Sequence, residues 1–153
     1  MKSTRTNVHF IYLAVGIALT LLFFVLRETV FGAIYYHPGF SDALYNTGLY
    51  DTIALLTLAM AWGMAAIYYY AINSVYFDRW YHWLAMLAVT VVVTPLVCYF
   101  VSGSVLRADG LEYGQQSAAF ELSNTVWTAL LFVVASFSLR WWSSNCRHTP
   151  IPQ

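Results

Sequence analysis

Four long runs of apolar residues alternate with shorter polar segments along the chain. A helix needs about 20 mostly apolar residues to cross the hydrocarbon core of a bilayer. Each run has about this length and is flanked by charged or polar residues, such as Asp51 before the second run and Arg140 after the fourth. The pattern therefore predicts four transmembrane helices, over residues 9–26, 52–72, 80–101 and 120–139.

The segments between these spans differ in length and character. Residues 1–8 form a short N-terminus, and residues 73–79 form a tight turn between the second and third spans. Residues 27–51 are rich in aromatic rings, so we expect them to form an aromatic cap over one end of the bundle. Residues 102–119 form a second loop on that side. Residues 140–153 show no apolar face, and we expect a disordered tail.

The distribution of basic residues predicts the orientation. With four spans, both termini and the 73–79 turn lie on one side of the membrane, and this side carries five of the seven basic residues. They are Lys2, Arg5, Arg79, Arg140 and Arg147. Cytoplasmic segments carry an excess of Lys and Arg. The chain is therefore predicted to be an all-α integral membrane protein, a four-helix transmembrane bundle with both termini in the cytoplasm.

The amino-acid composition further limits the protein class and the kinds of partner. Only 9% of the residues are charged, against about 25% in soluble domains, and the net charge is zero. Nucleic acid is excluded as a partner because phosphate binding requires a basic surface. Cys98 and Cys146 lack zinc-site spacing, and no metal site is expected. Short loops without a eukaryotic sorting signal favour a bacterial inner (plasma) membrane.

Small and hydroxyl-bearing residues indicate where the helices meet, because they allow close approach and hydrogen bonding in lipid. The candidate packing positions are Ala14 and Ala18 in the first span, Ala59 and Gly63 in the second, and Thr90, Thr94 and Pro95 in the third. Proline removes a helical hydrogen bond, so the third helix should be loosened or kinked near that residue.

The fourth span carries a polar stripe. Its members, at positions i, i+3, i+4 and i+7 of one helix face, are Glu121, Asn124, Thr125 and Thr128. An ionisable group within a span is costly and normally faces the bundle or a partner. Arg27 and Arg107 are the candidate ion-pair partners of Glu121. Alternatively, Glu121 reaches the headgroup layer, or it contacts another subunit or a ligand.

More specific functions, such as a transporter, a channel or a haem protein, have less support in the sequence. No charged residue or histidine lies at mid-depth in any span, which disfavours a self-contained transporter or channel. A pore between several copies, lined by Asn124 and Thr128, is an open alternative. His9 and His82 are the candidate axial ligands for a haem, but both residues open their helices, where an interfacial position explains a histidine. No cofactor is therefore expected.

These observations favour an interaction role rather than an enzyme. We expect a small multi-pass subunit, anchor or scaffold of a larger membrane assembly, such as secretion, envelope or transport machinery. Its partners would be lipids and other membrane subunits, or further copies of the chain, met through intramembrane helix contacts. The alternative is an enzyme or carrier for a lipid or lipophilic cofactor at the outer leaflet. In that case the polar site would combine Glu121, Asn124, His37 and Arg27.

Overall fold

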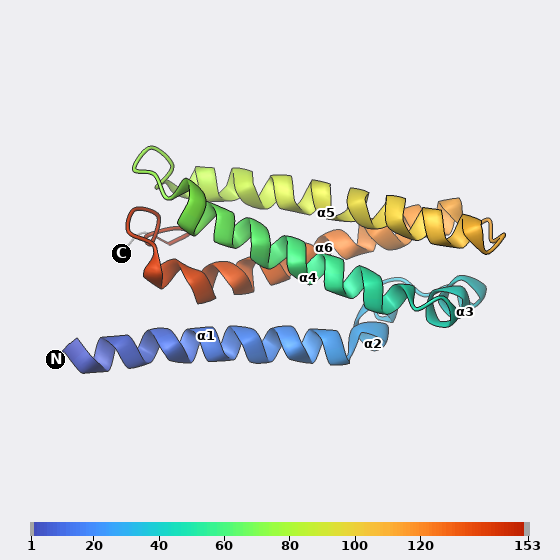
Figure 1. Cartoon of the computed structure of the whole chain (residues 1–153), viewed down its shortest axis with the longest axis horizontal. Coiled ribbons are helices and arrows are strands. Elements are labelled where there is room, and N and C mark those ends of the chain that lie inside the picture. Colours follow the sequence, from blue (N-terminus) through green and yellow to red (C-terminus); the bar gives the residue numbers. More distant parts are fainter. Residues whose placement is uncertain (1, 152–153) are drawn as a thin grey trace.

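The computed structural model describes residues 2–151, with side chains for residues 8–151. Helices account for 80% of the structure, and the described part contains no strand. Four helices are long and apolar enough to cross a membrane, as in a multi-pass membrane protein. They are α1 (Lys2–Val25), α4 (Leu49–Ala66) extended by the π-helix η1 (Ile67–Ile72), α5 (Trp80–Ala108), and α6 (Gly114–Leu139) extended by the 3-10 turn η2 (Arg140–Trp142) (Figure 1). The all-α prediction with four membrane-length helices is confirmed.

The third and fourth long helices extend beyond the predicted spans. α5 continues to Ala108 and α6 begins at Gly114, so that only residues 109–113 connect them. Gly110 makes this reversal with a φ of 72°, a conformation that glycine adopts without steric cost. The predicted loop over residues 102–119 is therefore mostly helix, because its polar residues interrupt the apolar pattern without breaking the backbone.

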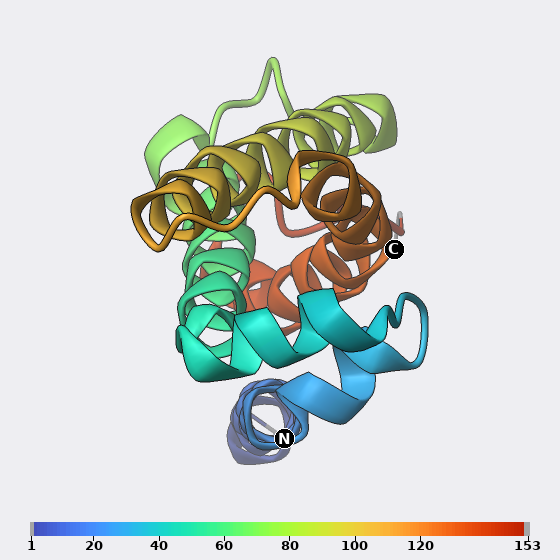
Figure 2. The ribbon, with the colours of Figure 1, turned by 90° about the vertical axis from the view of Figure 1, so that its right-hand side faces the viewer.

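The first predicted loop folds into two short helices, α2 (Arg27–Gly32) and α3 (Pro38–Asn46). Pro38 stands at the start of α3, where its fixed φ suits a helix and no N–H is needed. Figure 2 shows α3 lying across one end of the bundle, which we call the cap end. There, Phe31 and Phe40 pack on Phe120 of α6, with ring centroids 5.1 and 5.7 Å from it.

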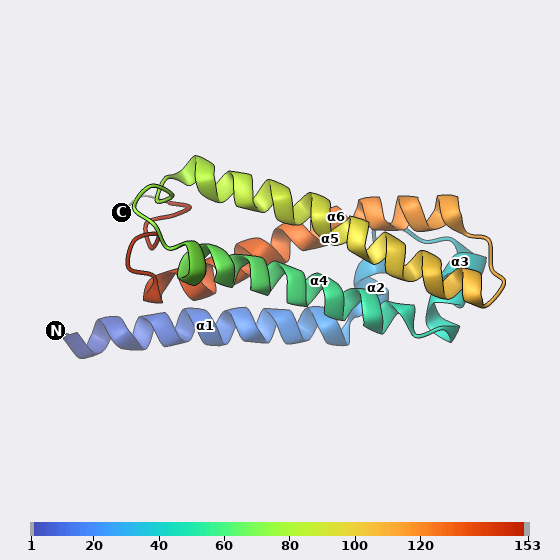
Figure 3. The same ribbon diagram turned by 45° about the horizontal axis from the view of Figure 1, so that its top comes forward.

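The tightly packed part of the bundle consists of α4, α5 and α6. Ala61 and Ala65 of α4 are fully buried, and their small side chains allow close helix approach. Trp83 of α5 donates its indole N–H to Ser136 of α6 at 3.0 Å. α1 lies along one margin of this group, chiefly against α6 (Figures 1 and 3), and only 11% of its apolar window is buried.

Both ends of the chain lie at the other end of the bundle, which we call the terminal end, together with the α4–α5 loop (Figure 1). The tail expected to be disordered is ordered here from residue 140 to residue 151. Asn73 fixes the tail in place. Its side chain forms hydrogen bonds with Ser143 Oγ, Ser144 Oγ and the backbone N–H of Asn145, each 2.9 Å long. The tail is fastened through polar groups, so an apolar face was not required.

The same fastening buries Cys146. Its Sγ lies 3.8 Å from the carbonyl oxygen of Ser74 and 3.7 Å from that of Phe77. Burial raises the pKa of the Cys146 thiol, and the nearby negative charge of Asp78 raises it further. Because the thiolate is the reactive form, we expect slow alkylation of this cysteine near neutral pH and faster alkylation as the pH rises.

Asn73→Ala should release the tail. The variant loses the side-chain bonds to the tail, each contributing about 0.5–1.5 kcal/mol. It also places alanine at a φ of 31°, a region that Asn tolerates better than alanine does. In a Cys98→Ser background we expect maleimide to label Cys146 about tenfold faster or more. Asn46→Ala, at an exposed asparagine of α3, is the matched control. Equal labelling rates in both variants would contradict this account of the tail.

Candidate functional site

The polar stripe of α6 faces the interior of the bundle. Glu121, Asn124 and Thr128 are 3%, 0% and 0% exposed, whereas Thr125 is half-buried beside them. The stripe meets two residues that sequence reasoning missed, Thr57 of α4 and Cys98 of α5, both fully buried. A single hydroxyl or thiol within a long apolar run gives little signal in a sequence.

Asn124 is the centre of this buried polar cluster. Its Nδ2 donates to Thr57 Oγ1 at 3.0 Å and to Glu121 Oε2 at 3.0 Å. Thr57 Oγ1 in turn lies 3.2 Å from Asn124 Oδ1, to which it donates, and 4.0 Å from Cys98 Sγ. Thr128 donates to the backbone carbonyl of Asn124 at 2.9 Å. These bonds tie α4 to α6 and place α5 against them.

Asn124 and Thr128 are enclosed within one chain, which bears on the pore alternative. A pore between copies needs its lining side chains on the outer surface of each copy. Both residues are 0% exposed and engaged in hydrogen bonds inside the bundle. The structure therefore argues against a pore lined by these two residues.

Glu121 is only partly satisfied. One carboxylate oxygen accepts from Asn124, and within the described residues the other, Oε1, is buried without a hydrogen-bond partner. Glu121 borders an open groove of about 430 Å³ between α5 and α6, which we call the α5–α6 groove. Pro95 lies on its other wall. The lining is otherwise mostly apolar, and Tyr99 and Thr125 are the other residues in it that carry a polar side-chain group.

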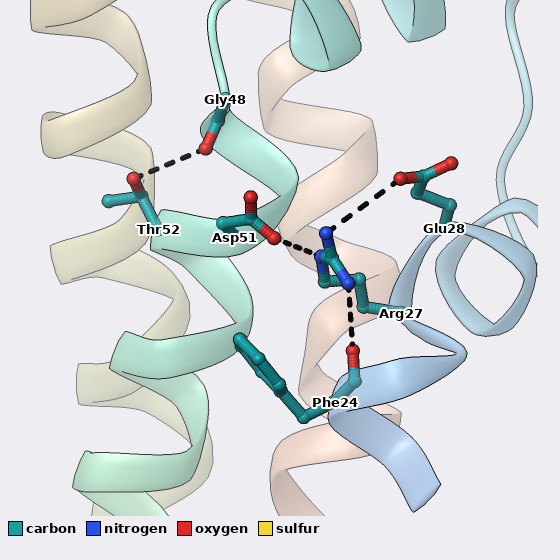
Figure 4. Close-up of polar contacts among 6 residues, drawn as sticks. All are labelled: Phe24, Arg27, Glu28, Gly48, Asp51 and Thr52. Carbon is teal, nitrogen blue, oxygen red and sulfur yellow. Dashed lines mark hydrogen bonds and ion pairs between the residues drawn. The ribbon is translucent and has the colours of Figure 1, made fainter.

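Arg27 does not pair with Glu121. It forms ion pairs with Asp51 and, at 3.9 Å, with Glu28, and donates to the Phe24 carbonyl at 3.2 Å (Figure 4). α1 ends at Val25 and the chain bends there, which directs Arg27 to the first turn of α4. Its expected role beside Glu121 is therefore wrong.

Arg107 does not reach Glu121 either. Its Nε donates to the Gly103 carbonyl of its own helix at 2.8 Å. No ion pair to Glu121 exists among the described residues. The carboxyl thus enters the bundle without a cation, which the residue spacing along the chain could not reveal.

His37 is exposed at the start of α3, and its backbone N–H lies 3.4 Å from the Ser41 hydroxyl, to which it donates. Phe120, on α6 one residue before Glu121, is buried beneath the rings of α2 and α3. The structure therefore does not assemble Arg27 and His37 with the polar cluster, and the four-residue outer site expected from the sequence does not form.

The two candidate haem ligands, His9 and His82, pack against different elements. His9 stacks on Trp141 of η2 at a centroid distance of 4.7 Å. His82 lies against Tyr81 and Phe77, with centroids 4.3 and 4.9 Å away. Across residues 8–151, no group of three or more metal-binding side chains gathers in one place.

Of the seven packing candidates, Thr90, Thr94 and Pro95 are buried in α5. Ala14, Ala18 and Ala59 are exposed, and Gly63 is half-buried with nothing close to it. The close contact of α1 is made instead by Gly16, where an added Cβ would lie 3.0 Å from the Ser138 Cβ. The predicted positions on α1 were thus wrong, because the helix turns Gly16 rather than its two alanines toward α6.

No protein-family model, curated protein or solved structure matches this chain.

Proposed function

We propose that the protein is a small multi-pass subunit, anchor or scaffold of a larger membrane assembly, and that α1 and α4 present its contact face. Nearly all of the described chain lies in four membrane-length helices and their short connections, which leaves little mass outside the bilayer for another activity. The terminal end carries most of the basic residues, which supports a cytoplasmic position for both termini. A bacterial inner membrane is part of this proposal.

One observation carries the proposal: an apolar groove of about 400 Å³ runs between α1 and α4. We call it the α1–α4 groove. Its lining residues are Ile17, Thr20, Leu21, Leu55, Leu58, Ala59 and Trp62. Thr20 accepts from Trp62 Nε1 at 3.1 Å and donates to the Gly16 carbonyl at 2.8 Å. With its polar groups already bonded, the groove offers packing alone, which is what drives helix association in lipid.

A variant that fills this groove tests the proposal. Ala59 is exposed on its wall, and Ala59→Trp should exclude a partner helix. After gentle extraction from the source membrane, we expect native mass spectrometry to find partner subunits at fixed stoichiometry with the wild type and at least about tenfold less partner with this variant, a loss of about 1.4 kcal/mol.

Leu130→Trp is the matched control, because Leu130 is 51% exposed on α6 and lies outside the α1–α4 groove. It should retain the partner in full. A wild-type chain that stays monomeric under extraction conditions that keep other membrane complexes intact would contradict the proposal. So would an Ala59→Trp variant that binds as well as the wild type.

A carrier of lipophilic molecules is the second candidate function. It is favoured by the partly satisfied Glu121 carboxyl beside the α5–α6 groove. Without Arg27 and His37 at that point, the groove offers binding groups but no acid–base pair for catalysis. A lipophilic molecule that co-purifies with the wild type and is lost in Glu121→Gln, while the assembly survives, would favour this function over the first.

A further inference from the structure

Two hollows lie along the seam between α5 and α6, and Tyr99 lines both of them. One is the α5–α6 groove beside Glu121. The other, about 370 Å³, lies toward the cap end, between the last turns of α5 and the first turn of α6. Because Tyr99 lines both, the two hollows are neighbours along the seam, and together we call them the seam site. The α5–α6 groove is mostly apolar, whereas the hollow toward the cap end, which we call the upper hollow, combines apolar side chains with charged and hydroxyl groups.

The upper hollow holds two opposite charges, Arg107 and Glu112. The Arg107 guanidinium bonds the Gly103 carbonyl, and its Nη2 would lie 3.7 Å from a Cβ added at Gly103, so it rests along the wall of the hollow. In the part of the chain that the structure describes, neither charged group forms an ion pair. A guanidinium suits a phosphate, and a carboxylate suits an ammonium. The pair therefore fits a zwitterionic phosphate-containing head.

Two buried polar atoms mark the junction of the hollows. Ser117 lines the upper hollow and Glu121 lines the groove, and the two residues are 1% and 3% exposed. They lie one turn apart on α6, and neither atom has a hydrogen-bond partner in residues 8–151. A buried polar group left without a partner is destabilising. A hydroxyl placed between these two atoms would relieve that cost.

The depth of the junction suits the neck of a lipid. α6 is about 39 Å long at 1.5 Å per residue, whereas the hydrocarbon core is about 30 Å thick. Glu121 is seven residues from the start of α6 at Gly114, about two turns into the helix. It therefore lies just inside the boundary between the polar and apolar layers, with Arg107 and Glu112 on the polar side.

We propose that the seam site binds a zwitterionic lysophospholipid. Its phosphate contacts Arg107 and its ammonium contacts Glu112. The glycerol hydroxyl bonds the pair formed by Ser117 and Glu121, and the single hydrocarbon chain lies in the α5–α6 groove. The groove has apolar rims, exposed at Val92, Leu96 and Leu122, and because the seam offers a single such groove, the proposal places one chain in it. The site lies away from the α1–α4 groove, so this inference is independent of the proposed subunit role; it names a ligand class for the groove on which the second candidate function rests.

The test measures retention of lysophosphatidylethanolamine. The full chain is exchanged into lipid-free non-ionic detergent and titrated with this lipid while native mass spectrometry records bound mass. We expect one molecule per chain. Leu96→Trp, which fills the groove, and Arg107→Gln should each weaken binding about fivefold, the ratio for an interaction of about 1 kcal/mol. Leu130→Trp and Arg79→Gln, at an equally exposed leucine and at an arginine of the terminal end, are the matched controls.

A second titration tests whether the site recognises the lipid headgroup. Lysophosphatidylglycerol lacks the ammonium, so we expect it to bind about fivefold more weakly, and Glu112→Gln should abolish the difference between the two lipids. Equal retention of a two-chain phosphatidylethanolamine would overturn the single-chain assignment. Binding that is indifferent to Leu96→Trp would show detergent-like partitioning and overturn the site. A wild type that binds no lysophospholipid, but loses a protein partner in Leu96→Trp, would assign the seam to a helix instead.

Discussion

Asn124→Leu should lower the stability of the bundle by about 2 kcal/mol, which corresponds to a fall in Tm of about 6 °C for a chain of this size. The substitution removes the bonds that Asn124 makes with Thr57 and Glu121. Single hydrogen bonds between membrane helices contribute about 0.6 kcal/mol on average. The larger expected loss arises because Glu121 is left buried with neither oxygen bonded. Thermal unfolding in detergent, followed by circular dichroism, measures it.

Two further variants isolate the cause. Thr57→Val keeps the shape of the side chain, and combined with Asn124→Leu it should cost less than the sum of the single changes, since the two residues share a bond. Thr125→Val is the control: the Thr125 hydroxyl bonds only the Leu122 carbonyl of its own helix, at 2.6 Å. A Tm for Asn124→Leu equal to that of the control would show that the cluster does not hold α4 to α6.

Gly16→Leu should separate α1 from the rest of the bundle. Any Cβ at this position overlaps the Ser138 hydroxyl, and the Ser138 Cβ would be only 3.0 Å from it, so the backbones of α1 and α6 must move apart. Overpacking of this kind costs about 1–3 kcal/mol. Spin labels on Val25→Cys and Leu130→Cys, both exposed positions, in a background without Cys98 and Cys146, should report a broader distance distribution and a lower Tm.

Gly63→Leu provides the matched comparison. This glycine also lies within a long helix, but no atom lies within 4 Å of an added Cβ. Because glycine is about 1 kcal/mol less favourable than alanine within a helix, we expect the Gly63 variant to be as stable as the wild type or slightly more so. Equal behaviour of the Gly16 and Gly63 variants would contradict the close approach of α1 to α6.

These expectations depend on one feature of the bundle: the polar cluster around Asn124 faces inward, and the α1–α4 and α5–α6 grooves are mostly apolar. The sequence suggested that the polar stripe on α6 contacts a partner. In the structure the stripe forms hydrogen bonds inside the bundle instead, from Asn124 to Thr57 and Glu121. Two surfaces remain accessible to other molecules: the groove between α1 and α4, and the seam between α5 and α6. The two proposals therefore concern different faces and fail independently.

The sequence by itself determined the four membrane-length helices, because the cost of placing residues in lipid depends on local composition. It also determined that Glu121, Asn124 and Thr128 share one face of α6, because helix geometry sets that spacing. Helical periodicity sufficed for both predictions, and neither required knowledge of a neighbouring helix.

Only the tertiary structure decided which groups meet. It paired Arg27 with Asp51 rather than Glu121, and placed Gly16 rather than Ala14 at the α6 contact. It also ordered the tail through Asn73. In lipid the outer face of a helix is as apolar as its packed face, so hydrophobic pattern does not reveal how each helix is rotated about its axis. Contacts between residues that are far apart in the chain set this rotation. The rotation in turn determines which partner each polar side chain meets.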